Sequence, residues 1–170
     1  AWLGASAYAG IEIEAPDAVK PILTRVQPTG EEGYYSVMVA RSDSGIETLD
    51  DTEGKTLGYA DPNSTSGYLV PKVALDEKLD GGVASHFADA RFMGSHANAV
   101  LGVLNGDVDV AVTWSSGIGE RDEGYTSGNL RIMVDNGTLN MDDIVEVWRS
   151  GLIPNGPVVM PENLPAEAYD

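Results

Sequence analysis

The segment "DVDVAVTW", residues 107–114, constrains the fold more than any other part of the chain. Its centre is apolar on both faces, which is typical of a strand in a sheet that helices cover on both sides. The preceding segment "SHANAVLGVLNGD", residues 95–107, predicts a helix that Ser95 caps and Asn105-Gly106 ends. A helix that leads directly into a buried strand indicates an α/β fold.

The rest of the chain continues this alternation of strands and helices. We predict a further helix at 64–79, which Pro71 weakens in its middle. The opening "AWLGASAYAG" is interpreted as an interior strand and turn without a signal peptide, and so as part of a longer precursor. Together these segments predict a doubly wound α/β lobe. Further strands are predicted at 33–41, 56–60, 91–94, 129–135 and 143–150.

The charge of the chain excludes several classes of partner. Its 170 residues carry 10 Lys and Arg against 27 Asp and Glu, a formal net charge of −17. A nucleic-acid binder needs a basic patch, and binding to an anionic membrane surface is disfavoured for the same reason. We interpret the acidity as an aid to solubility, with cation binding by the acidic surface as the alternative. The chain has no cysteine, which excludes disulfides, thiolate metal sites and cysteine nucleophiles.

Ser64, Thr65 and Ser66 place three hydroxyl groups where strand 56–60 passes into helix 64–79. Ligands of doubly wound sheets bind at the carboxyl ends of the strands, and a helix start offers N–H groups and a positive dipole end. The segment is therefore a candidate site for a tetrahedral oxyanion. The alternative is that Ser64 or Ser66 only caps the helix. The segment is not a nucleotide P-loop, because it lacks the glycine spacing and the lysine.

Four segments resemble, in this order, the phosphonate-binding proteins of bacterial ABC importers: "YYSVMVARSDSGIETLDD", "DPNSTSGYLVP", "GSHANAVLGVLNGDVDVAVTW" and "WRSGLIPNGPVV". The resemblance runs over nearly the whole chain, from "WLGASAYAG" onward, and extends to the phosphite-binding relatives of that family. It implies the type II periplasmic binding protein fold, an α/β protein of two lobes with doubly wound mixed sheets.

The resemblance also implies how the chain divides. Residues 1–42 would form part of the first lobe with the first hinge strand, and 43–150 the second lobe. Residues 151–170 would form the second hinge crossing and the return to the first lobe. Family members are longer, so the chain is expected to hold a full second lobe and part of the first. A tyrosine that they supply from an earlier segment has no counterpart here.

The resemblance assigns ligand-binding roles to single residues. Residues 64–66 correspond to the loop that grips the phosphonate oxygens. Tyr34 corresponds to a tyrosine that donates its hydroxyl from the hinge side, although alone it would be interpreted as a core aromatic. His96 corresponds to a histidine at a helix start, whose protonated form a nearby dianion would favour. Alone it would be a neighbour of a helix cap or a surface residue. Trp114 would close over the apolar end of the ligand, hold a cation, or only pack between the lobes.

Two positions depart from the family members that bind 2-aminoethylphosphonate. Those members hold the ammonium of the ligand with carboxylates, and at the matching positions this chain has Ser116 and Gly156. A buried ammonium that is left unpaired costs on the order of several kcal/mol. We therefore expect a compact ligand, such as methylphosphonate, another small alkylphosphonate or phosphite.

The resulting hypothesis is a monomeric periplasmic solute-binding protein, without a cofactor or metal. It would deliver a small phosphonate or phosphite to the membrane permease of an ABC importer. The alternative is a ligand-sensing regulatory domain of the same fold. An enzyme acting on a phosphorylated small molecule is disfavoured, because no carboxylate is placed to orient His96 and no cluster has metal-ligand spacing.

Overall fold

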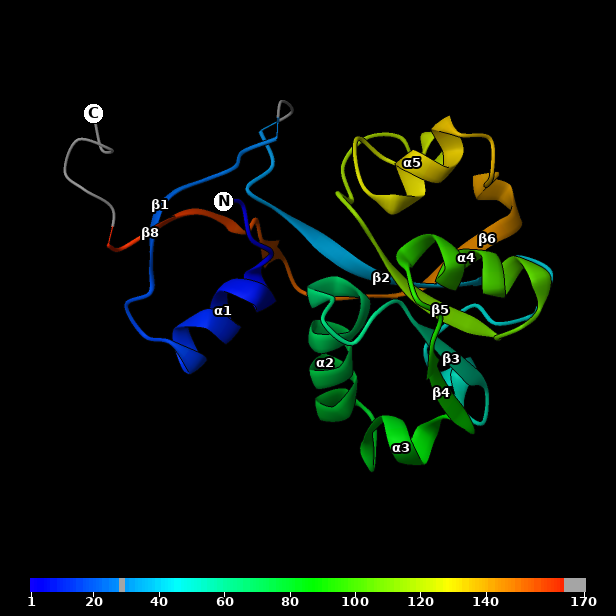
Figure 1. Ribbon diagram of the computed structural model, residues 1–170. Coiled ribbons are helices and arrows are strands. Elements are labelled where there is room, and N and C mark those ends of the chain that lie inside the picture. The colour runs from blue at the N-terminus through cyan, green and yellow to red at the C-terminus, as the bar shows by residue number, and fades with distance from the viewer. Residues whose placement is uncertain (28–29, 164–170) are drawn as a thin grey trace. The chain divides into compact units, whose positions relative to one another are not determined.

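A mixed sheet forms the centre of Tyr34–Ile153, the larger of two units into which the chain divides. The computed structural model describes residues 1–27 and 30–163 (Figure 1). The strands of this sheet are β2 (Gly33–Arg41), β3 (Thr56–Tyr59), β4 (Asp89–Phe92), β5 (Val110–Ser115), β6 (Ile144–Arg149) and β7 (Ile153–Pro154). Their order is β4-β3-β5-β2-β6, and β7 pairs with β2.

The strand directions bring several strand ends to one edge of the sheet. β3 runs parallel to β4 and β5, whereas β2 runs antiparallel to β5 and β6. The start of β2 therefore lies beside the end of β5, where Tyr35 is paired with Ser115. The carboxyl ends of the parallel strands and the amino end of β2 meet at this edge.

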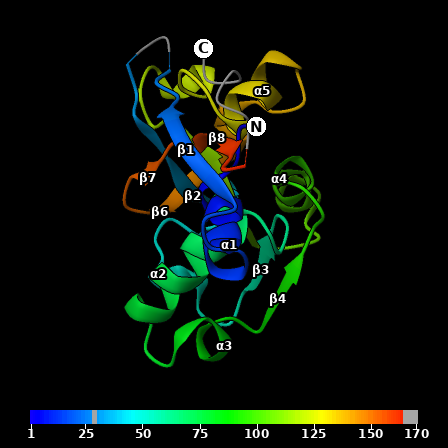
Figure 2. The same cartoon turned by 60° about the vertical axis from the view of Figure 1, so that its left-hand side comes forward.

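Helices cover both faces of the sheet, as the apolar centre of β5 predicts. One face carries α2 (Val70–Lys78) and α3 (Gly82–His86), and the other carries α4 (His96–Asn105) and α5 (Asn129–Asp135), as Figures 1 and 2 show. A π-helical turn, η2 (Thr65–Leu69), leads into α2. Short 3₁₀ turns are η1 (Asp50–Thr52), η3 (Arg121–Glu123) and η4 (Met141–Asp143).

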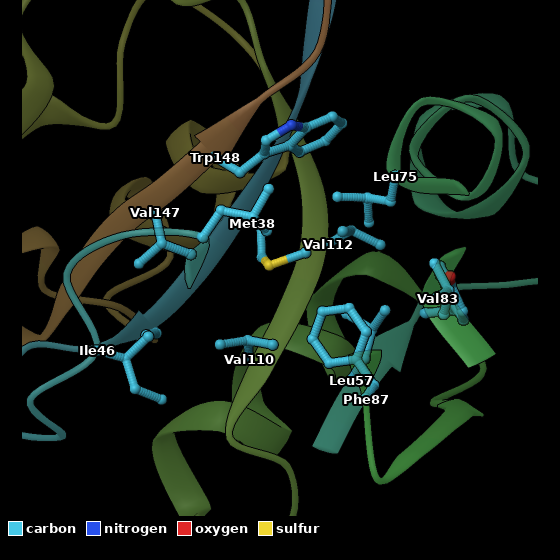
Figure 3. Packing of buried hydrophobic residues seen from close by; sticks show 13 residues of the cluster. Met38, Ile46, Leu57, Leu75, Val83, Phe87, Val110, Val112, Val147 and Trp148 are labelled. Carbon is cyan, nitrogen blue, oxygen red and sulfur yellow. The ribbon is translucent and has the colours of Figure 1, made fainter. Parts of the chain in front are cut away.

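The core divides between the two faces because successive side chains of a strand point to opposite sides. Met38 packs with Val112 and with Leu75 of α2 on one face (Figure 3). Val37 and Val39 pack on the other face, where α4 and α5 supply the remaining apolar side chains. Each of these residues of β2 is fully buried, so β2 is a central strand that both layers hold in place.

The predicted α/β class and mixed sheet are confirmed, and β2 has the predicted bounds 33–41. The prediction of a strand at 129–135 was wrong, because this segment forms helix α5. Its buried Leu130 and Met133 are three residues apart and share one helical face. β4 begins and ends two residues before the predicted 91–94.

The smaller unit contains Ala1–Gly33 and the segment from Pro154 onward. Helix α1 (Ala5–Glu14) precedes β1 (Val19–Thr24), and β1 pairs antiparallel with β8 (Pro157–Pro161). Of the strand predicted at the opening of the chain, only a bridge between Trp2 and Val158 is present. The predicted turn was wrong, because the residues that follow form α1. The Ala and Glu residues of α1 are good helix formers. Within residues 1–27 and 30–163, no helix has the length and apolar character needed to cross a membrane.

Candidate functional site

The loop after β3 enters its helix through a capped and unusually tight turn. Ser64 has an extended backbone, and its Oγ accepts a hydrogen bond from the N–H of Gly67 at 2.9 Å. A Cβ at Gly67 would lie 2.5 Å from the Cβ of Ala60 and 2.8 Å from Cε1 of His96. Only glycine allows this close approach, so the sequence Ser64-Thr65-Ser66-Gly67 folds tightly against the end of β3.

The sequence left two roles open for the three hydroxyls, capping and ligand binding. Ser64 does cap the helix. The side chains of Thr65 and Ser66 instead form hydrogen bonds with the Tyr34 hydroxyl. The three hydroxyls therefore face two different neighbours, and capping accounts for only the first of them.

Pro71 does not weaken the middle of a helix, contrary to our expectation. It lies in the first turn of α2, where a missing N–H is tolerated. The helix predicted at 64–79 is divided at this point into η2 and α2. In η2 the N–H of Leu69 donates to the carbonyl of Ser64 at 3.0 Å, a step of five residues.

His96 is the first residue of α4, and its ring reaches the loop after β3. Its Nε2 lies 3.0 Å from Oγ of Ser64, and its Nδ1 lies 3.5 Å from Oγ1 of Thr113 on β5. Ser95 caps α4 as predicted, because its Oγ accepts from the N–H of Asn98 at 3.1 Å. Burial lowers the pKa of His96 from 6.5 to about 4, and the nearby Asp61 opposes this only in part. Near pH 7 the imidazole is therefore neutral in the protein by itself.

Tyr34 and Trp114 complete the cluster from the two central strands. Their rings meet edge to face, with centroids 5.4 Å apart and an interplanar angle of 72°. Burial raises the pKa of Tyr34, and its hydrogen bonds with Thr65 and Ser66 act in the opposite direction. The phenol thus stays protonated at neutral pH and is able to donate a hydrogen bond.

The structure brings all six predicted site residues into one set of contacts. Ser64 contacts His96, Tyr34 contacts Thr65 and Ser66, and Trp114 contacts Tyr34. All of them belong to the larger unit and gather where the strand ends meet. Hydroxyl, imidazole and phenol groups are neutral donors, so this cluster suits an anion that accepts several hydrogen bonds.

Sequence reasoning missed three buried polar residues that support this cluster: Ser36, Thr113 and Ser150. The Oγ of Ser36 donates to the carbonyl of Ser66 at 2.7 Å, and the N–H of Ser36 donates to Oγ of Ser150 at 3.0 Å. Thr113 faces the imidazole of His96. Each looks like an ordinary strand residue in the sequence, so no local signal identifies it.

Ser116 and Gly156, the positions that the resemblance matched to the carboxylates of members binding 2-aminoethylphosphonate, are occupied in other ways. Ser116 is buried, and its Oγ lies 2.7 Å from Oγ1 of Thr126. Any side chain at Gly156 would collide with the backbone carbonyl of Leu3 within the smaller unit. In the part of the chain that the structure describes, no three His, Asp or Glu side chains are grouped to hold a metal ion.

Comparison with known proteins gives a consistent result. A family model described as "ABC transporter, phosphonate, periplasmic substrate-binding protein" matches residues 1–170. The phosphonates-binding periplasmic protein of Escherichia coli K12 is 34% identical over 149 residues, which are 85% of this chain and 40% of that protein. The phosphate-import protein PhnD of Mycolicibacterium smegmatis is 29% identical over 147 residues, 83% of this chain and 42% of that protein.

A solved structure extends the match to the fold. It is the binding protein component of an ABC phosphonate transporter from Pseudomonas aeruginosa, 30% identical, with a TM-score of 0.73. The match covers 99% of this chain and 52% of that protein. The chain therefore spans about half of the length of the solved relative, and 40% and 42% of the two curated relatives. The predicted type II periplasmic binding protein fold is confirmed, and the chain belongs to the periplasmic substrate-binding family of phosphonate ABC transporters.

Proposed function

We propose that this chain carries the anion-binding part of a solute-binding protein that captures a small phosphorus oxyanion and delivers it to an ABC permease. The observation that carries the proposal is the convergence of Ser64, Thr65, Ser66, Tyr34 and His96 at one edge of the sheet. Family membership supports the same reading. A tetrahedral oxyanion has three or four oxygens, and each accepts hydrogen bonds from donors of this kind.

The proposed ligand lies at the entrance of η2, where the hydroxyls of Thr65 and Tyr34 approach one another. His96 would donate through one ring nitrogen or act through Ser64, to which it is hydrogen-bonded. Trp114 would cover the part of the ligand that carries no oxygen, since its ring already packs against Tyr34. Hydrogen bonds to a charged ligand contribute about 1.5–3 kcal/mol each, so four or five would support tight binding.

The ligand is proposed to be compact and to lack an ammonium group. Ser116 offers only a hydroxyl that is engaged with Thr126, and Gly156 has no room for a side chain beside Leu3. Methylphosphonate, other small alkylphosphonates and phosphite meet this requirement. Phosphate joins the candidates, because one relative is named for phosphonates and another for phosphate import.

The setting of this function is proposed from the family as well. The protein would act in the periplasm as a monomer and catalyse no reaction. Its lobes would divide near residues 42 and 150, so that most of the site lies on the second lobe and Tyr34 lies on the first hinge strand. The relatives that the chain matches are periplasmic binding proteins.

A calorimetric panel tests the proposal. Methylphosphonate, 2-aminoethylphosphonate, phosphite, phosphate and sulfate are titrated into the protein, and each titration is repeated with the Tyr34→Phe variant. We expect one of the compact phosphorus anions to bind most tightly, and the variant to bind it more weakly. Tightest binding of 2-aminoethylphosphonate would contradict the compact-ligand proposal. Binding of none of the five would contradict the proposed function.

A further inference from the structure

Ser36 makes an unusual contact with the loop that carries the three hydroxyls. The residue is fully buried on β2, and its Oγ donates to the backbone carbonyl of Ser66 at 2.7 Å. Its own N–H donates to Oγ of Ser150, and its carbonyl accepts from the N–H of Ser150 at 2.9 Å. Ser36 is thus held firmly by Ser150 and holds the loop in turn.

The carbonyl of Ser66 needs this contact because Pro71 removes its helical partner. In η2 the carbonyl of Ser64 accepts from Leu69, and that of Thr65 accepts from Val70. The next donor in this series of five-residue steps would be residue 71, which is a proline and has no N–H. A buried carbonyl without a partner is costly, and the hydroxyl of Ser36 supplies the missing donor.

In a normal α-helix the N–H of residue 71 would donate to the carbonyl of Gly67, four residues earlier. Proline has no N–H, so this hydrogen bond is also missing. That carbonyl accepts instead from the N–H of Ala60 at the end of β3, at 3.0 Å. Two successive carbonyls of the turn are therefore bonded to the sheet rather than to the helix. Pro71 favours this arrangement, because residue 71 offers no N–H to the Ser66 carbonyl at a five-residue step or to the Gly67 carbonyl at a four-residue step.

Tyr34 lies two residues before Ser36 and points to the same face of β2. Its hydroxyl holds the side chains of Thr65 and Ser66, while Ser36 holds the backbone between Ser66 and Gly67. We propose that Ser36 is a positioning residue for the anion site, which fixes the orientation of the hydroxyl loop through the Ser66 carbonyl. This inference rests on the proposed function of the loop, and Ser36 itself does not touch the ligand.

The proposal predicts a dependence on Pro71 that simple packing would not produce. In Ser36→Ala the Ser66 carbonyl loses its donor, and the loop relaxes toward another turn. Affinity for methylphosphonate or inorganic phosphate should fall by about tenfold or more. In the double variant Ser36→Ala, Pro71→Ala, residue 71 regains an N–H that serves the turn. Part of the lost affinity should then return, which gives a non-additive double-mutant cycle.

Amide hydrogen exchange provides a readout that needs no ligand. The N–H groups of Gly67 and Leu69 are both bonded within the turn. Their exchange should become faster in Ser36→Ala and slower again in the double variant. If the alanine variant does not fold, Ser36→Cys keeps a side-chain donor, although a weaker one, and should give an intermediate loss of affinity.

Thr52→Val is the matched control. The Oγ1 of this buried threonine donates to the carbonyl of Leu49 at 2.6 Å. Thr52 lies before β3 in the chain, whereas the hydroxyl loop follows β3. We expect a similar loss of stability without a change in anion affinity. Ser36→Ala binding within about twofold of wild type, or purely additive effects with Pro71→Ala, would overturn the inference. If the wild-type protein binds none of the five anions of the calorimetric panel, the proposed function is wrong, and the exchange rates then decide whether Ser36 holds the loop.

Discussion

The Oγ of Ser64 lies 3.0 Å from Nε2 of His96, although the two residues are 32 positions apart in the chain. The same oxygen accepts the N–H of Gly67 at 2.9 Å, so it closes the turn and meets the start of α4 at once. If His96 donates from Nε2, the hydrogen of Ser64 is left for an anion. Ser64 can therefore cap the turn through its oxygen and donate its hydrogen to an anion at the same time.

The neutral state of His96 predicts how stability changes with pH. Its pKa is about 4 in the folded protein and 6.5 in the unfolded chain, so between these values the unfolded chain binds more protons. The contribution of neutral His96 to the free energy of unfolding is therefore fully present above pH 6.5, and it is lost as the pH falls toward 4. The loss should be about 3 kcal/mol in the free energy of unfolding, measured by urea denaturation at a series of pH values.

His96→Gln isolates this effect, because the variant keeps every carboxylate and His86. Its stability should fall less than that of the wild type over the same pH range. Parallel curves for the two proteins would show that His96 is not buried in its neutral form.

Thr65→Val removes one hydroxyl of the loop and keeps its shape. The hydroxyl is expected to donate to the anion, and such a bond contributes about 1.5–3 kcal/mol, so affinity should fall roughly 10- to 100-fold. Calorimetry with the preferred anion measures the change. Thr138→Val is the control, since its hydroxyl donates to the carbonyl of Met133 at 3.1 Å and lies outside the cluster. Equal affinity in Thr65→Val and wild type would remove Thr65 from the site.

Gly67→Ala should damage the site and the fold together. The new methyl group would lie 2.5 Å from the Cβ of Ala60 and 2.8 Å from both Oγ of Ser64 and Cε1 of His96. Overpacking of this kind costs typically about 1–3 kcal/mol, and here it also pushes Ser64 and His96 apart. Thermal unfolding and anion titration should both show a loss. Gly151→Ala, which adds its methyl group to open space, should show neither.

Much of the fold could be predicted from the sequence because its signals are local. The Val and Tyr residues of 33–41 and the capped helix after Ser95 identify β2 and α4 without knowledge of their partners. The wrong prediction of a strand at 129–135 also came from relying on local signals alone. Its Ile, Met and Val residues suit either a strand or a helix, and only contact with the sheet decides between them.

The contacts within the site could not be predicted in this way. The contacts of Ser36 and Thr113 depend on which segments become neighbours, since Ser36 of β2 donates to the Ser66 carbonyl of the π-helical turn and Thr113 of β5 faces His96. The low pKa of His96 depends on burial between segments that are distant in sequence. The resemblance suggested the residues of the candidate site, whereas the hydrogen bonds that support them are visible only in the structure.

Tight anion binding should persist despite the net charge of −17. Carboxylates spread over the surface act mostly beyond a Debye length, which is about 8 Å at physiological salt, so their repulsion is screened. The donors of the loop, Tyr34 and His96 would touch the anion directly, where water is excluded. Higher ionic strength screens only the repulsion. We therefore expect affinity to stay nearly constant or to rise slightly as salt increases.

The measurement is a calorimetric titration of the preferred anion over a range of sodium chloride concentrations, provided that chloride itself does not compete. Chloride competition is tested separately by exchanging it for a larger monovalent anion at equal ionic strength. An anion site built from lysines and arginines would instead lose affinity steeply with salt, because its attraction acts through the solvent. A steep loss that is the same for both salts would contradict the assignment to neutral donors. A flat or rising curve is the expected outcome, since the attraction then comes from short hydrogen bonds that salt does not screen.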